Sequence, residues 1–293
     1  MLDHTFFDGL SRLQLKMSHK SSLNSSGSHR SLRKGSSTEF SDFREYMPGD
    51  DLRRMDWNIY ARLDKLYIRE YMEEKEAQVR VLIDTSASMD YGAASKAELA
   101  KDLAAVVSFL ALNNMDRVLL YDMKDMGRAL SVGGGRGAFA KVLHWLEQME
   151  FSGEINMLSA VRKMRCAGGG VTVMISDFLH PDMVDERAAS SYEKLLRYLD
   201  YCGQRPVILH TMASEELHVT LEGVLNLIDA ETDLKRRLLV DAKAIDSYER
   251  ELARFMERMK KGCASGRGVY VLCDTGRDRK QLVFQDLRVI YDI

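Results

Sequence analysis

Residues 79–89, Val-Arg-Val-Leu-Ile-Asp-Thr-Ser-Ala-Ser-Met, join a short apolar stretch to a polar loop. The run from Val79 to Ile83 is mainly apolar and β-branched, which is typical of a buried strand. Asp84, Ser86 and Ser88 follow it directly. Because open α/β sheets place their ligand sites at the carboxyl ends of strands, we expect these side chains to line such a site. One carboxylate and two hydroxyls are hard oxygen ligands, which suit Mg²⁺ or Mn²⁺.

The chain beyond this loop alternates between helical and strand patterns. Ser95 to Glu98 has the pattern of a capping box, and apolar residues follow it at helical spacing. A second apolar run, Val171 to Ile175, is followed by Asp177 and predicts another buried strand. This alternation predicts an α/β fold, with a doubly wound, mostly parallel sheet covered by helices on both faces. We expect the two apolar strands to be neighbours, so that their aspartates converge.

The first 76 residues have a different character and are interpreted as an amino-terminal extension to a domain spanning 77–293. Residues 3–17 have helical spacing, 18–38 form a Ser-rich loop, and 39–76 are dense in charged and aromatic residues. In the last segment Pro48-Gly49-Asp50 is a turn signal. We interpret the segment as a structural collar, with a ligand site as the alternative. The expected ion pairs there join the acidic residues Glu39, Asp42, Asp50, Asp51 and Asp56 to Arg44, Arg53, Arg54 and Arg62.

The composition limits the class of protein. A formal net charge of −2 over 293 residues gives no reason to expect a nucleic-acid partner or an anionic membrane. The longest apolar run, Leu103 to Leu112, is far shorter than the roughly 20 residues that span a bilayer. The first ten residues lack the pattern of a signal peptide, and the four cysteines lack metal or redox spacing. We therefore expect a cytoplasmic protein without a membrane span.

The collar segment and the loop after it resemble the bacterial domain-of-unknown-function fifty-eight family. Members carry a set of charged and aromatic pairs upstream of a domain similar to von Willebrand factor A. The matching positions here are Glu39-Phe40, Arg44, Tyr46, Gly49-Asp50-Asp51, Asp56-Trp57 and Arg62. Further matches are residues 27–31, Ser176-Asp177-Phe178, Glu215-Glu216, Asp229 and Glu231-Thr232. The resemblance covers roughly residues 10 to 275 and implies a von Willebrand factor A-like fold.

The resemblance also implies a metal-ion-dependent adhesion site. Its first loop would supply Asp84, Ser86 and Ser88, and its third loop Asp177. The second loop normally supplies a threonine, but the alignment places Ile155 there, and an isoleucine cannot bind a cation. Occupancy by Mg²⁺ or Mn²⁺ therefore stays open. In the alternative interpretation, the two aspartates end their strands and accept hydrogen bonds from the serines.

Family members are commonly encoded beside AAA+ ATPases of the MoxR type. The resemblance therefore implies a non-enzymatic binding module that couples such an ATPase to a client protein. One alternative is a metal-dependent phosphatase or hydrolase that uses Asp84. A phosphatase of the haloacid-dehalogenase type needs a second aspartate two residues later, where this chain has Ser86. Another alternative is a metal-free scaffold, which Ile155 favours.

Overall fold

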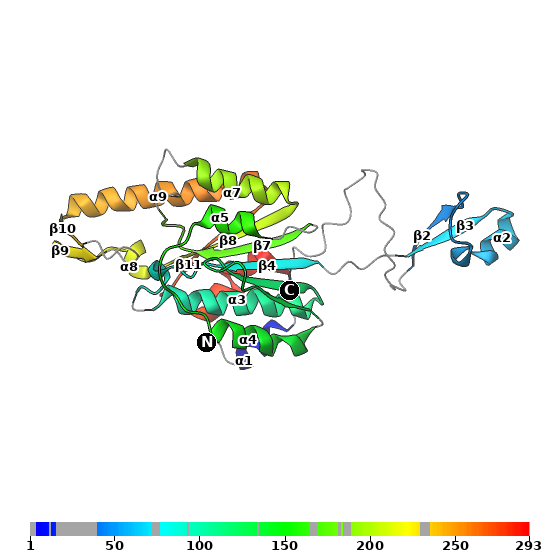
Figure 1. The fold of residues 1–293 in the computed structure, drawn as a ribbon, viewed down its shortest axis with the longest axis horizontal. Helices are drawn as coiled ribbons and strands as arrows, with labels where there is room; N and C mark the ends of the chain where they lie inside the picture. The colour runs from blue at the N-terminus through cyan, green and yellow to red at the C-terminus, as the bar shows by residue number, and fades with distance from the viewer. Residues whose placement is uncertain are drawn as a thin grey trace. The chain divides into compact units, whose positions relative to one another are not determined.

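The computed structural model describes residues 4–11, 13–15, 40–71, 77–92, 94–133, 135–164, 169–180, 183, 189–228 and 235–292, and the chain divides into two compact units (Figure 1). The smaller unit spans residues 25–76, and the larger one 1–24 and 77–293. The units differ from the expected extension 1–76 in one respect. Helix α1 (His4–Leu10) and strand β1 (Gln14–Leu15) belong to the larger unit, where β1 pairs antiparallel with β12 (Tyr291–Asp292).

The larger unit is built on a six-stranded sheet of order β11-β8-β7-β4-β5-β6. Its strands are β4 (Gln78–Ile83), β5 (Arg117–Asp122), β6 (Leu130–Val132), β7 (Gly170–Ser176), β8 (Gln204–Met212) and β11 (Val269–Asp274). All neighbours are parallel except the β5–β6 pair at one edge. In chain order this is the 3-2-1-4-5-6 arrangement of a doubly wound sheet. The predicted α/β fold with a doubly wound, mostly parallel sheet is confirmed.

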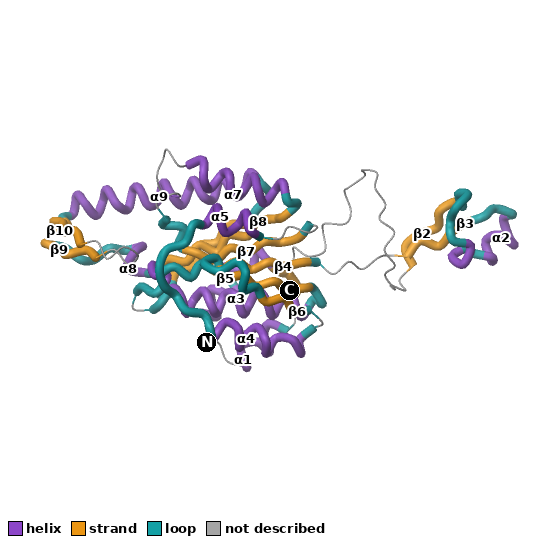
Figure 2. Tube along the Cα trace, in the orientation of Figure 1, coloured by secondary structure: helices purple, strands orange, loops and turns teal. Residues whose placement is uncertain are grey.

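Helices cover both faces of this sheet (Figure 2). One face carries α1, α3 (Lys96–Asn113), α4 (Phe139–Glu147) and α10 (Arg279–Phe284). The other face carries α5 (Met157–Lys163), α7 (Ala189–Tyr201) and α9 (Ala242–Ser265). Each face encloses a separate apolar cluster, as a doubly wound sheet requires. No helix among the described residues is long and apolar enough to cross a bilayer.

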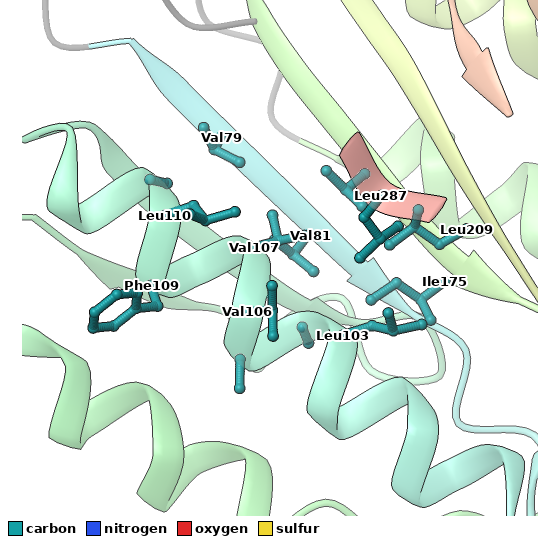
Figure 3. Packing of buried hydrophobic residues seen from close by; sticks show 14 of the residues in the cluster. Val79, Val81, Leu103, Val106, Val107, Phe109, Leu110, Ile175, Leu209 and Leu287 are labelled. Carbon is teal, nitrogen blue, oxygen red and sulfur yellow. The ribbon is translucent and has the colours of Figure 1, made fainter. Parts of the chain in front are cut away.

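The central strand β4 is buried on both faces of the sheet, which explains its mainly apolar sequence. On β4, Val79 and Val81 pack against α3, while Leu82 belongs to the cluster on the opposite face. Figure 3 shows the α3 side, where Val107 and Leu110 approach these valines. Burying a side chain of this kind contributes about 1.5–3 kcal/mol to the free energy of folding. Packing against α3 therefore stabilises β4 and the position of its carboxyl end.

Two further regions complete the described elements. After β8 come α8 (Ser214–Leu217) and a hairpin of β9 (Gly223–Ile228) with β10 (Lys235–Val240). The smaller unit contains β2 (Phe40–Glu45), the 3-10 turn η2 (Leu52–Arg54), α2 (Trp57–Leu63) and β3 (Tyr67–Tyr71). Strands β2 and β3 form an antiparallel pair.

Candidate functional site

The candidate site lies at the point where the strand order reverses. The chain runs from β4 outward to β5 and β6, then returns to β7 on the other side of β4. Strands β4 and β7 are parallel neighbours, with Ile83 opposite Ile175, so the prediction that they are adjacent is confirmed. Asp84 and Asp177 follow these two strands directly. Open α/β sheets bind ligands at such a switch point, beyond the carboxyl ends of the strands.

The first loop forms a compact hydrogen-bonded arrangement around Asp84. One carboxylate oxygen, Oδ1, accepts from the backbone N–H and the hydroxyl of Ser86, at 2.9 and 2.6 Å. The other oxygen accepts from the Ser176 hydroxyl at 2.6 Å. The hydroxyls of Ser86 and Ser88 are 3.0 Å apart. Asp84 and Ser86 are buried and Ser88 is half-buried, so the predicted residues of the first loop are brought together as one cluster.

Burial makes Asp84 a weaker acid than an exposed aspartate. Desolvation is the main cause that raises its pKa, and the nearby charge of Asp177 adds to it. The hydrogen bonds from Ser176 and Ser86 act in the opposite direction, because they favour the charged carboxylate. The net result is a pKa of about 6 for Asp84. This carboxyl therefore changes its charge close to neutral pH.

The site also contains a buried lysine that the sequence analysis did not predict. Lys96, at the start of α3, is only 1% exposed, and its Nζ lies 2.8 Å from Oδ2 of Asp177. The same Nζ lies 2.7 Å from Oε1 of Glu216 on α8. Burial alone would lower the pKa of Lys96, but the two carboxylates more than offset this and hold it above its ordinary value. The ammonium is therefore a fixed positive charge at the switch point.

These residues do not complete the three-loop cation site that the resemblance implies. Ile155 is buried in the apolar cluster with α5 and α7, so the second loop contributes a core side chain. Its neighbour Asn156 caps α5 by accepting from the Ser159 N–H at 2.8 Å. The Asp177 carboxylate of the third loop is held by the Lys96 ammonium. Only the first loop presents oxygen ligands without a competing partner of opposite charge, and one loop falls short of the full ligand set.

The buried histidine near the site does not supply a base. The ring Nδ1 of His210, on β8, lies 2.7 Å from the Tyr270 hydroxyl. Burial lowers the pKa of His210 to about 4, which keeps the ring neutral. It packs edge-on against Phe178 and Phe255. These contacts describe a core side chain that joins β8 to β11, to the loop after β7 and to α9.

In the smaller unit, some of the expected ion pairs form and others have different partners. Arg44 contacts Asp50 at 2.8 Å as expected, and Asp50 also accepts from the Met47 N–H in the turn where Gly49 has φ +106°. Asp56 instead contacts Arg69 at 2.7 Å. Asp51 accepts from the Arg53 N–H and so begins the turn η2.

The aromatic and basic members of that motif lie mostly at the surface of the smaller unit. Trp57 is 62% exposed and contacts Tyr60 edge to face. The side chains of Arg53 and Arg62 are exposed, and the Tyr46 N–H donates to the Leu66 carbonyl. Within this unit, Asp56 is the buried member of the motif, at 4% exposure, because it caps α2.

Two residues of the site could not be assigned a role from sequence. Lys96 falls inside a capping-box pattern, where a first-turn lysine is normally solvated, and Ser95 does cap the helix through the Ala97 N–H. Glu216 matched the family pattern without an evident partner. The pairs they make join residues 81 and 120 positions apart, which no local pattern can reveal.

Both known sequences and solved structures are similar to this chain. The uncharacterized proteins Mb1516 of Mycobacterium bovis and Rv1480 of Mycobacterium tuberculosis are each 27% identical over 257 residues, covering 82% of this chain and 76% of theirs. Among solved structures, the conserved hypothetical protein BatB of Bacteroides thetaiotaomicron matches with 15% identity and a TM-score of 0.38, covering 73% of this chain and 98% of that one. An aerotolerance-related membrane protein of Bacteroides fragilis matches with 16% identity and the same TM-score, covering 73% and 99%.

A family model extends over most of the chain. It is described as "Protein of unknown function DUF58" and matches residues 42–258, which include both the charged motif of the smaller unit and the switch-point loops. The match runs across Asp84, Lys96, Asp177 and Glu216. The chain therefore belongs to the DUF58 family of proteins of unknown function.

Proposed function

We propose that this chain is a non-enzymatic protein-interaction module whose partner is a MoxR-type AAA+ ATPase, acting in the assembly or activation of a client protein. One observation carries the proposal. At the switch point both aspartates are buried and engaged, Asp84 by hydroxyl and N–H donors and Asp177 by the Lys96 ammonium. Neither carboxylate is offered to a substrate as nucleophile or base. What remains at this edge of the sheet is a set of ordered loops suited to recognition.

The loops around the site hold each other in place, as a recognition surface requires. The Ala87 N–H donates to the Gly153 carbonyl at 2.9 Å, which ties the first loop to the second. A Cβ added at Gly92 would lie 3.1 Å from Cβ of Ala213, so the end of the first loop packs closely on the start of α8. Tyr91 stands on this surface with half of its side chain exposed. Partly exposed tyrosines on ordered loops are common anchors of protein interfaces.

A phosphatase or hydrolase that uses Asp84 is supported less well. Such an enzyme needs an acid close to the nucleophile, and the residue two positions later is Ser86, which donates its hydroxyl to Asp84. An attacking carboxylate must also reach the substrate, whereas Asp84 is 3% exposed. The side chains at the switch point are thus arranged to bond to one another.

The test is a binding measurement between the full chain and the MoxR-type ATPase encoded in the same genome. Tyr91→Ala should weaken binding about tenfold or more, since truncating an interface tyrosine typically costs over 1 kcal/mol. The matched control is Tyr201→Ala, because Tyr201 is 88% exposed. It precedes the amino end of β8, whereas the switch point lies at the carboxyl ends of the strands. Binding lost equally in both variants would contradict this choice of surface, and a wild-type chain that does not bind the ATPase would contradict the partner.

A further inference from the structure

The buried ammonium of Lys96 joins three segments that are distant in sequence. It belongs to the first turn of α3, Asp177 to the loop after β7, and Glu216 to α8. The ring of Tyr91 covers it, with the centroid 5.8 Å from Nζ. Glu216 is itself anchored, because its second oxygen, Oε2, accepts from the Ala213 N–H at 2.9 Å. A single cation therefore holds the loops of the switch point together.

In an adhesion-type site, a divalent cation holds the corresponding loops together. A metal there would bring the first and third loops together by binding oxygens from both. Here the third-loop carboxylate binds the ammonium, and α8 supplies a second carboxylate to it. A divalent cation bound by Asp177 would lie close to this ammonium, which contacts the same carboxylate, and like charges repel strongly in the interior. The ammonium and the carboxylates of Asp177 and Glu216 instead form one set of contacts.

We propose that the ammonium of Lys96 takes the place of a divalent cation at this site, so that the chain holds its switch-point loops together without a metal. Ile155 is consistent with this substitution, because a second-loop hydroxyl has no role once no metal must be coordinated. The inference concerns the site itself and does not depend on the proposed partner.

The experiment measures Mn²⁺ binding to the full chain by calorimetry and thermal melting after treatment with a chelator. For the wild type, about 5 mM Mn²⁺ should move the melting temperature by less than about 1 °C. Lys96→Met removes the ammonium and leaves the carboxylate of Asp177 close to that of Glu216 and within electrostatic reach of Asp84. The same Mn²⁺ concentration should then raise the melting temperature by about 5 °C or more, because an ion that binds only the folded state stabilises it.

Two control variants separate charge from packing. Lys96→Arg keeps a positive charge and should stay unresponsive to Mn²⁺. Adding Asp84→Asn to Lys96→Met removes a ligand and should abolish the gained response. If Lys96→Met does not fold, Lys96→Gln replaces it, because an amide can hydrogen-bond to both carboxylates without carrying charge. The same gain of Mn²⁺ binding is expected from it.

Two results would overturn the proposal. One is wild-type binding of Mn²⁺ with a Kd below about 100 μM that disappears in Asp84→Asn, because the native site would then hold a metal beside the lysine. The other is a folded, uncharged Lys96 variant that gains no Mn²⁺ binding. Such a variant would show that the carboxylates around the ammonium are not placed as cation ligands.

Discussion

Replacing Asp84 by asparagine removes a buried negative charge and keeps the size of the side chain. Asp84 is 3% exposed, and its oxygens accept hydrogen bonds from Ser86 and Ser176. Burial and the nearby Asp177 raise its pKa from 3.8 to about 6. The wild type must either keep a proton on this group or hold an unfavourable charge in its core, whereas the asparagine variant avoids both.

The size of the effect follows from the difference between the two pKa values. Between about pH 4 and pH 6 the folded chain keeps a proton on Asp84 that the unfolded chain has released. The folded state then binds more protons, so the free energy of unfolding falls as pH rises. Two pKa units at 1.36 kcal/mol each amount to about 3 kcal/mol. The penalty is absent below the unfolded pKa of 3.8 and complete above the folded pKa of about 6.

Urea unfolding of wild type and Asp84→Asn, in chelator, between about pH 4 and pH 8 measures this directly. Titration of carboxyl groups that do not interact with Asp84 cancels when the two free energies are subtracted. The advantage of the variant should grow by about 2 kcal/mol between pH 4 and pH 6 and level off above about pH 7. A difference that does not vary with pH would refute the reasoning, because it would mean that Asp84 has an ordinary pKa in the folded chain.

Four further variants test other parts of the structure. Asp177→Asn should shrink the pH-dependent advantage of Asp84→Asn in the same unfolding series, because it removes the second cause of the raised pKa. Gly170→Ala should lower the free energy of unfolding by about 1–3 kcal/mol, because its Cβ would overlap a backbone carbonyl oxygen of β4. Gly137→Ala, whose Cβ would meet no atom within 4 Å, should change it by less than about 0.5 kcal/mol. Asp56→Ala should increase proteolysis of residues 40–71 at neutral pH but not in acid, because an arginine and the helix cap lower the pKa of Asp56 and its contribution is lost as pH falls.

The fold could be predicted because its decisive features are local. Val79 to Ile83 and Val171 to Ile175 are mainly apolar and carry apolar side chains on both sides, which indicates strands buried on both faces. Asp84 and Asp177 follow these two strands and so marked the carboxyl end of the sheet as the candidate site. Sequence could not show where α1 packs, because helical spacing reveals an apolar face but not its partner. Here Phe6 contacts Phe284, a residue at the other end of the chain.

The site could be predicted only in part, for a related reason. Asp84, Ser86 and Ser88 lie within one loop, so their convergence follows from the backbone turn that carries them. The partners of Asp177 come from α3 and α8, and only the folded sheet brings these elements together. A lysine at the start of a helix is normally solvated, and nothing in its neighbours distinguishes a buried one.

The substitution at Ile155 and the burial of Lys96 have one physical explanation. A site that lost its second-loop ligand would bind a metal weakly and would leave the carboxylates at the switch point without compensation. An ammonium carried by the chain itself removes that problem, because it needs no loading and cannot be removed by chelation. It pairs with the carboxylates of Asp177 and Glu216, whereas the pKa of Asp84 is raised mainly by burial and further by the charge of Asp177. The Mn²⁺ response of Lys96 variants therefore tests the charge balance around Asp177 and Glu216, and the pH dependence of Asp84→Asn tests the burial of a carboxylate beside Asp177.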